Sequence, residues 1–546
     1  MKKSMKKYLI SLISGLVLLI ILYAYVMRSV KNPEIAELPY YTFRSFFRIT
    51  MAYLLSLVIG LSFGIAAALN KRFSSIITPT FDILQSIPIL GFFPAAIMIF
   101  IMIFPGQVGL EMASIFLLFT SMVWAIFFGV VGAAKSIPIN ILDSAKAFGI
   151  KGFNFIIHVM IPAITPAIIS GSFLAWSDGW FFMIAAEYIT YAGEIRSLPG
   201  LGSFLAKSAY VNNDINLAAT ILILITYLVL FVNYFTWHRL IEKVSGYSHM
   251  IKLGFFSLPH DKKLKKKRFT QQYKFRHHVL RKSRWRIYTA HQRLISVIIV
   301  IAIFSFVIYS IMGRFPSIEF IKKSIFVPEI VNLPFYTFFT MSRLTIAYLI
   351  SLALAISMGI LAAEKKKFAA IFYTFYDIGQ AIPILAVFPI LYIYLSGIFP
   401  GTLGLEISAI TMLVLDMIWY MFLNIVVAVK SMPEETKEVS KIFGFKGMKR
   451  IKYIIIPVIL PAIVTGSLLS WATGWNTVIF SEYMPYGNKT VSIPGLGSFL
   501  SKEGYEQGNT ILLIFILFII SSIVILMERF IWRKLLQKTE KYELEV

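Results

Sequence analysis

One twenty-residue stretch occurs twice in this chain. Residues 143–162 read DSAKAFGIKGFNFIIHVMIP and residues 438–457 read EVSKIFGFKGMKRIKYIIIP, with equivalent positions 295 residues apart. In both versions an acidic residue opens the stretch, a glycine follows six positions later, and Ile-Pro closes it. An acid suits the first turn of a helix, glycine often ends a helix in the left-handed conformation, and proline is tolerated where a helix begins. The stretch therefore predicts a short helix followed by the start of a longer one.

The repeat extends far beyond this stretch. The same offset of 295 holds without a gap over most of the chain outside its middle. Equivalent pairs include Leu38 and Leu333, Pro88 and Pro383, Trp124 and Trp419, Pro199 and Pro494, and Trp237 and Trp532. Self-similarity over such a length indicates two copies of one structural unit. We expect a first copy at residues 1–240, a linker at residues 241–293 and a second copy at residues 294–546.

Composition excludes a water-soluble globular protein. Of the 546 residues, 58% are hydrophobic and 14% are charged, and the mean hydropathy is +0.77. The absence of cysteine rules out disulfides, thiolate metal sites and cysteine nucleophiles. A membrane-spanning helix needs about 20 mostly apolar residues, because its backbone must satisfy its own hydrogen bonds in lipid. Twelve such spans are predicted, at residues 9–27, 49–69, 81–104, 110–133, 161–186, 216–237, 294–312, 344–363, 376–399, 405–429, 456–481 and 511–531.

Charge predicts how these spans are oriented. The chain carries 52 lysines and arginines against 27 acidic residues, a net charge of +25. Basic residues cluster before the first span, after the second and between the fourth and fifth, so alternation places them on one side. Because short basic loops stay in the cytoplasm, we expect a multi-pass protein of the cell membrane with both termini cytoplasmic. The first span is expected to be retained and not removed as a signal peptide, and nucleic acid is not an expected partner.

The two copies are expected to be parallel, because six spans, an even number, separate equivalent points. Between them, the linker contains the basic runs 262–268 and 281–286. Such runs are typical of a cytoplasmic tether that also sets topology, and the alternative is binding to anionic lipid.

The repeated stretch lies in the predicted loop between the fourth and fifth spans of each copy. Its acid, its two following residues, its glycine and its closing proline are spaced as in a known loop, so the chain resembles the ABC importer permeases at their Glu-Ala-Ala loop. The matching positions are Asp143, Ser144, Ala145, Gly149 and Pro162 in the first copy, and Glu438, Val439, Ser440, Gly444 and Pro457 in the second. The segments around Pro88 and Pro383 further resemble permeases of the nitrate, sulfonate, taurine and bicarbonate type.

This resemblance implies a fold, a function and partners. The fold would be the all-α integral membrane type I ABC importer fold, with two permease copies fused in tandem. The chain would be the translocation subunit for a small, anionic solute, and each short helix would be a coupling helix that docks into a cytoplasmic ATPase. The partners would be two such ATPase subunits and an extracytoplasmic solute-binding protein. Because the sequence has no Gly-x-x-x-x-Gly-Lys-Ser/Thr phosphate loop, ATP and Mg²⁺ are expected on the ATPases, with no cofactor on this chain.

Polar and aromatic residues within the spans are candidates for the solute path. Charge in lipid is costly and usually faces protein or water. Asp178 and Asp416 have no acidic equivalent, because Thr473 and Ser121 occupy the matching positions. Their asymmetry indicates either a one-sided solute contact or drift at a water-lined position. The other candidates are Gln85, Gln380, Trp176, Trp180, Trp471 and Trp475, with core packing as the alternative for the tryptophans.

Arg48 and Arg343 begin the second span of each copy and are candidates for drawing anions to the outer mouth, with interfacial anchoring as the alternative. The histidines show no metal-ligand spacing, and no nucleophile–base grouping appears, so neither a metal site nor a catalytic site is expected. An ion-coupled secondary transporter also has twelve spans in two parallel halves. It would need an ion relay and no docking helix. A membrane scaffold without transport is disfavoured by the paired loops.

Overall fold

The computed structural model of the chain describes two long segments. They are residues 36–240 except 192, 193 and 213, and residues 327–539 except 431, 433, 487 and 488, with a few isolated residues between 295 and 325. We call these segments the first half and the second half. The predicted linker and the predicted span at 9–27 lie outside the described residues, as does most of the predicted span at 294–312.

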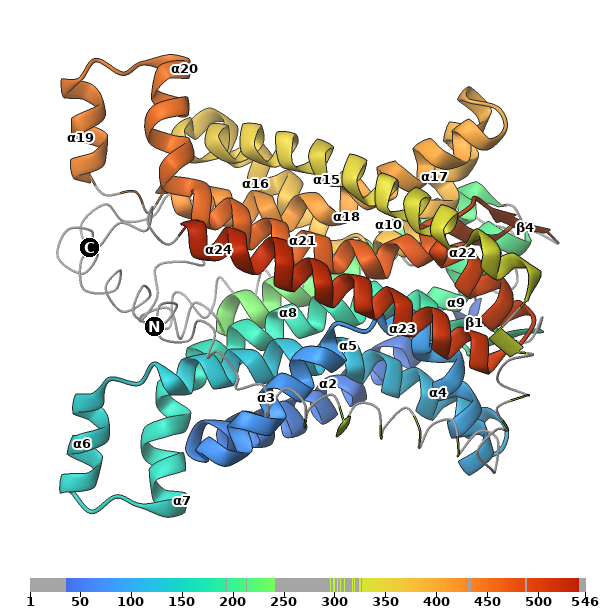
Figure 1. Ribbon diagram of the computed structural model, residues 1–546, viewed down its shortest axis with the longest axis horizontal. Helices are drawn as coiled ribbons and strands as arrows, with labels where there is room; N and C mark the ends of the chain where they lie inside the picture. The colour runs from blue at the N-terminus through green and yellow to red at the C-terminus, as the bar shows by residue number, and fades with distance from the viewer. Residues whose placement is uncertain are drawn as a thin grey trace.

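The first half is built mainly from helices that run side by side (Figure 1). Its elements are α2 (Leu38–Leu69), α3 (Lys71–Gln85), α4 (Ile89–Ile103), α5 (Gln107–Lys135), α6 (Ile139–Ala147), α7 (Gly152–Phe155), the π-helical turn η2 (Ile156–Met160), α8 (Ile161–Glu187), the strands β1 (Tyr188–Tyr191) and β2 (Glu194–Ser197), α9 (Leu201–Ala206), η3 (Lys207–Val211), α10 (Ile215–Val232) and η4 (Asn233–His238).

The second half repeats this order. Its elements are η5 (Pro328–Asn332), α15 (Leu333–Glu364), α16 (Lys366–Ala381), α17 (Ile384–Ile398), α18 (Thr402–Lys430), α19 (Glu434–Ile442), α20 (Gly447–Arg450), η6 (Ile451–Ile455), α21 (Ile456–Glu482), β3 (Tyr483–Tyr486), β4 (Lys489–Ser492), α22 (Leu496–Leu500), η7 (Ser501–Glu506), α23 (Thr510–Met527), η8 (Glu528–Trp532) and α24 (Arg533–Thr539). The offset of 295 is preserved at both ends of α2 and α15 and of α5 and α18. The repeat in the sequence is therefore a repeat of structure.

The described residues contain eight helices that are long and apolar enough to cross a membrane, or ten if each of two bent pairs counts as one span. The predicted spans at 81–104 and 376–399 are not single straight helices. The structure instead breaks each of them into two helices, α3 with α4 at an angle of 100° and α16 with α17 at 98°. Pro88 and Pro383 lie at the breaks, where proline lacks an amide donor and disfavours a helical residue before it.

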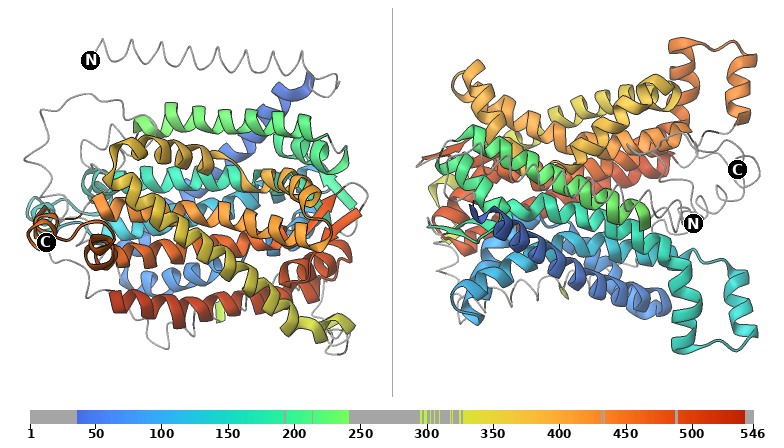
Figure 2. Two further views of the ribbon diagram at one scale, coloured as in Figure 1. Left: turned by 90° about the horizontal axis from the view of Figure 1, so that it is seen from above. Right: turned by 180° about the vertical axis from the view of Figure 1, so that it is seen from behind.

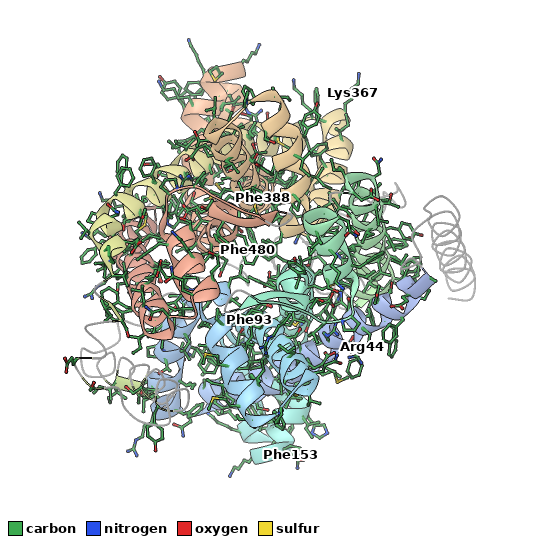
Figure 3. The ribbon with its side chains drawn as sticks, turned by 90° about the vertical axis from the view of Figure 1, so that its right-hand side faces the viewer. Arg44, Phe93, Phe153, Lys367, Phe388 and Phe480 are labelled. Carbon is green, nitrogen blue, oxygen red and sulfur yellow. The ribbon has the colours of Figure 1, made fainter. Side chains whose placement is uncertain are left out.

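The two halves interlock through the helices that follow these breaks. In the first half α4 contacts α21 and α23 of the second, and α17 of the second half contacts α8 and α10 of the first. Seen along the spans, Phe93 of α4 and Phe388 of α17 lie near the centre of the molecule (Figure 3), and both are buried. One apolar cluster accordingly contains residues from both halves, including Leu90, Ile97, Leu385 and Phe388.

The two ends of the molecule differ in structure. At one end α6 and α19 project away from the long helices, on opposite sides of the molecule (Figures 1 and 2). We call this the knob end, and the knobs are residues 138–152 and 434–447. At the other end lie two short antiparallel hairpins, β1 with β2 and β3 with β4. We call this the hairpin end. The hairpins are an addition to the predicted all-α architecture.

Candidate functional site

Both knobs contain the short helix and the glycine cap that their sequences predict, but Asp143 lies in the second turn of α6 and not in the first. In the first knob α6 ends at Ala147 with Phe148 as its C-cap, and Gly149 has a φ of +69°. The amide of Ile150 then donates to the carbonyl oxygen of Ala145 at 2.9 Å, which satisfies an otherwise free carbonyl at the helix end. In the second knob Gly444 has a φ of +65°, and the Phe445 amide donates to Ser440 O at 2.9 Å. The predicted left-handed glycine caps are confirmed in both knobs.

The knobs present apolar side chains to their surroundings. Phe148 is 82% exposed and Phe443 is 71% exposed, and they occupy equivalent positions. Ile139 and Ile141 on α6 are also exposed, as is Ile442 on α19. An exposed apolar set on an otherwise polar protrusion is typical of a surface that another protein covers.

The family-motif residues of the first knob divide by exposure. Asp143 is exposed and forms an ion pair with Lys146 at 3.3 Å, and the Ser144 hydroxyl donates to Asn140 O at 2.7 Å. Ala145, on the same helix, is buried. A hollow of about 340 Å³ adjoins the helix, lined by Asn140, Ile141, Ser144, Ala145, Phe148, Ile150 and Val159. In the second knob Glu438 is exposed and Ser440 is buried, while the Val439 side chain lies outside the description.

The prolines that close the motif lie farther inside the helix than predicted. The sequence placed the starts of these spans at 161 and 456, but each helix begins at Gly152 or Gly447 and continues through a π-helical turn. Pro162 and Pro457 are the second residue after that turn. Because proline cannot donate to the carbonyl one turn earlier, the wider turn accommodates the missing hydrogen bond.

A buried ionic cluster holds the hairpin end of the first half together. Arg48 on α2 is 1% exposed, and its Nε and Nη2 donate to the Glu111 carboxylate on α5 at 2.6 and 2.8 Å. Its Nη1 donates to Glu187 at the end of α8 at 2.8 Å. The hydroxyl of Ser45 donates to the same Glu187 oxygen and accepts from the Leu201 amide, while the Gly202 amide donates to the other oxygen at 2.7 Å. One carboxylate thus joins α2, α8 and the start of α9.

The second half has the same cluster. Arg343 donates to Glu406 through Nε and Nη2 at 2.6 and 2.5 Å, and to Glu482 through Nη1 at 2.8 Å. Thr340 replaces the serine, and the Gly497 amide donates to Glu482 at 2.8 Å. Arg48 and Arg343 are therefore buried and compensated, which favours a structural role over attraction of anions. Sequence reasoning did not single out Glu111 and Glu406, although each lies 63 residues after its arginine in both copies.

The four candidate tryptophans are buried in the helix packing. Trp176 contacts Tyr53 and Trp237 edge-on or tilted, with ring centroids 5.7 and 6.1 Å apart, and Trp471 contacts Tyr348 and Trp532 in the same way. Trp180 and Trp475 are also buried. This placement favours the packing interpretation.

Two further pairs of candidate residues lie apart from this packing. Gln85 and Gln380 lie beside the two breaks, near the ends of α3 and α16, where Gln85 is exposed. Asp178 on α8 and Asp416 on α18 come from different halves, and their charges interact. The two carboxyl groups therefore lie within electrostatic range of each other across the two halves. Over the part of the chain that is described, no group of three or more His, Asp or Glu side chains is placed to hold a metal.

Comparison with known families identifies the class of protein. The family model described as "Binding-protein-dependent transport system inner membrane component" matches residues 56–244 and again residues 355–539. The chain belongs to this family and carries its domain twice in tandem. It is thus an ABC importer permease in which two copies are fused, a multi-pass membrane protein of the type I importer fold.

Several characterised or named permeases are similar to parts of the chain. The bicarbonate transport system permease protein of Synechococcus elongatus is 27% identical over 175 residues, 32% of this chain and 58% of that protein. The nitrate import permease protein of Leptolyngbya laminosa is 25% identical over 173 residues, 31% of this chain and 57% of that protein. A putative aliphatic sulfonates transport permease protein of Bacillus subtilis is 24% identical over 203 residues, 37% of this chain and 69% of that protein. The chain thus spans less than three fifths of the length of the first two relatives.

Proposed function

We propose that this chain is the complete translocation subunit of an ATP-driven importer. Two ATPase subunits bind the knobs, and a solute-binding protein delivers a small solute at the hairpin end. Closure of the ATPases on ATP moves the two knobs together, and the halves rock between two orientations around a path between them. ATP and Mg²⁺ are held by the ATPases. The knob end is then the cytoplasmic end, with both termini on that side.

The observation that carries this proposal is the pair of matching knobs. They project from the same end (Figure 1) and occupy equivalent places in the repeat. Each exposes a phenylalanine directly after its short helix. Two equivalent knobs suit a partner that has two equivalent clefts, because the two halves that carry them are related by the repeat. A rigid helix capped by a left-handed glycine can transmit a push without bending, which coupling between distant sites requires.

The loops at the hairpin end supply the expected docking region for the solute-binding protein. There Pro199 and Pro494 precede α9 and α22, which the buried Glu187 and Glu482 hold in place. The relatives are named for bicarbonate, nitrate and sulfonates, which supports a small anion as the first class of solute to test.

The test of this function is purification of the full chain from its own cell membrane under mild detergent. We expect an ATPase with a Gly-x-x-x-x-Gly-Lys-Ser/Thr loop to be captured at two copies per chain. In proteoliposomes, uptake should require ATP on the knob side and should persist when ion gradients are collapsed. Uptake that needs an ion gradient and no ATP would instead establish the secondary transporter.

A further inference from the structure

An ion pair joins the base of the second knob to a neighbouring long helix. Arg450 is the last residue of α20, the helical turn that leads out of the knob, and Glu364 is the last residue of α15. Arg450 Nη1 lies 2.7 Å from Glu364 Oε1, and less than a third of either side chain is exposed. The pair therefore ties the turn below the knob to the end of α15 that lies at the knob end of the molecule (Figure 1).

The place of this pair along its own helix matters for how movement is transmitted. Directly after Arg450 the helix widens into the π-helical turn η6, and Pro457 and Pro461 follow in α21. Helices bend at π-helical turns and at prolines, so this part of the helix yields when the knob is displaced. Because Arg450 lies on the knob side of η6, its ion pair provides a second route from the knob, directly into α15.

Helix α15 is suited to carry movement over the length of the molecule. It has 32 residues, which at a rise of 1.5 Å per residue is a length of about 48 Å, and Pro334 in its first turn is its only proline. Toward its other end, Arg343 holds Glu406 of α18 and Glu482 of α21. One continuous helix thus connects the base of the second knob with the ionic cluster at the hairpin end.

The first half lacks this connection. Phe155 and Leu69 occupy the positions that are equivalent to Arg450 and Glu364, and neither can form an ion pair. Phe155 packs against the apolar cluster of its own half, while Leu69 is 50% exposed. The turn α7, the π-helical turn η2 and helix α8 nevertheless form as their equivalents do. The fold of a knob therefore does not require the pair, and a partly exposed ion pair contributes little to stability.

We propose that Arg450 is a positioning residue for transport, and that its ion pair with Glu364 makes α15 a strut between the second knob and the hairpin end. When the ATPases close, the second knob moves α15 as well as α21, whereas the first knob acts through α8 alone. The two halves are then driven unequally. This inference rests on the proposed function and adds to it the route by which one ATPase moves the outer end of the path.

The first test measures whether the ion pair braces the base of the knob, and it needs no ATPase. Hydrogen–deuterium exchange is followed in the full chain in lipid nanodiscs, with Arg450→Gln and Glu364→Gln as the variants. In both, the amides of residues 447–455 should exchange about threefold faster or more, and those of the equivalent residues 152–160 should not change. Unchanged exchange at 447–455 would overturn the strut and would leave the proposed function standing.

The second test measures movement of the hairpin end in the complex of the full chain with its ATPases. Because the chain has no cysteine, Val211→Cys and Lys502→Cys give exactly one site for a spin label in each half. Both residues are exposed and lie in η3 and η7 at the hairpin end. Electron–electron resonance then reports the distance between the two labels before and after addition of ATP and Mg²⁺. We expect ATP to shift the distribution of distances in the otherwise unmodified complex.

Charge exchange separates transmission through the pair from a merely structural role. Arg450→Glu and Glu364→Arg should each reduce the shifted fraction about threefold or more while the ATPases stay bound, and the double variant should restore most of it. Lys449→Glu is the matched control, because it reverses a charge at the exposed neighbour of Arg450 and should keep the full shift. A full shift in both single variants, or no recovery in the double variant, would overturn the proposal. No shift in the unmodified complex would refute the proposed function and this inference with it.

Discussion

Arg48 on α2 lies 2.8 Å from Glu187 at the end of α8, and Arg343 makes the same contact with Glu482 in the second half. Each arginine also holds a carboxylate on α5 or α18 in a two-point hydrogen bond. Each glutamate in turn accepts an amide hydrogen bond from the start of α9 or α22. The cluster therefore fixes the hairpin end, where delivery of the solute is proposed, to the helices that cross the membrane.

Arg48→Met should destabilise the chain severely. The substitution keeps an apolar stem but leaves Glu187, which is fully buried, without its cation, and breaking a buried pair in this way costs about 3–5 kcal/mol. Unfolding of the purified chain in mixed micelles measures the loss. Arg44→Gln is the control, because Arg44 pairs with Glu111 from a partly exposed position and should contribute about 0–1 kcal/mol. Equal losses of unfolding free energy in the two variants would show that the buried Arg48–Glu187 pair contributes no more to stability than the partly exposed pair of Arg44.

Gly202→Ala should displace α9 from its place at the hairpin end. A Cβ at Gly202 would lie 2.8 Å from Ile184 Cα and 3.0 Å from Glu187 Oε2, and the first of these atoms is backbone that cannot rotate away. We expect a loss of about 1–3 kcal/mol, typical of overpacking, and faster protease cleavage near residues 198–212.

Gly129→Ala is the matched control for that substitution. The nearest neighbour of a Cβ there would be Ala167 O at 3.5 Å, an ordinary contact, and Gly129 lies inside α5, more than one turn from its end. Alanine there should raise stability by about 0.5–1 kcal/mol through its better helix propensity. If Gly202→Ala causes no loss of stability either, α9 does not pack against α8 as tightly as described.

The knobs could be predicted from sequence, whereas the ionic clusters could not. A helix cap is formed by residues that are close in sequence, so Gly149 and Gly444 indicate the ends of α6 and α19 without knowledge of the fold. Arg48 and Glu187 are 139 residues apart, and the sequence around either residue does not indicate which residue it pairs with. The repeat offers one signal, because Glu111 and Glu406 keep their distance from the arginines in both copies.

Two other features show where hydropathy falls short. The breaks at Pro88 and Pro383 lie inside apolar runs that are long enough for a span. Hydropathy averaged over such a run therefore does not reveal the bend. The electrostatic interaction of Asp178 with Asp416 depends on how the two halves pack, and the sequence of each copy does not contain that information.

Gly149→Val and Gly444→Val should uncouple the ATPases while leaving the spans folded. A Cβ at either position meets nothing within 4 Å, so the harm comes only from the positive φ, which costs a non-glycine residue about 1–2 kcal/mol and more when it is β-branched. Membrane insertion should be normal, and transport-linked ATP hydrolysis should be lost. Gly149→Asn and Gly444→Asn should retain most of it, since asparagine tolerates this conformation. Normal hydrolysis in the valine variants would refute the docking role of the knobs.

Glu503 in η7 at the hairpin end should make stability depend on pH. It is 1% exposed, and burial together with the charges of Glu329 and Glu506 raises the pKa of its carboxyl, against the opposing effect of Lys502. Because the folded-state pKa is raised, the folded chain holds this proton more tightly than the unfolded chain. The stabilisation is complete below the unfolded pKa of about 4.3 and is lost as pH rises through the folded value.

Replacement of Glu503 should therefore stabilise the chain at neutral pH. Glu503→Gln removes the charge that must be buried, and Glu503→Ser installs the residue found at the equivalent position, Ser208, which is also buried. Thermal unfolding in detergent should show a higher midpoint than that of the unmodified chain at pH 7 and no advantage near pH 4. Lys502→Gln is the control, because loss of that cation should move the midpoint at pH 7 in the opposite direction. A gain that is the same at both pH values would show that the substitution acts through packing and not through the proton.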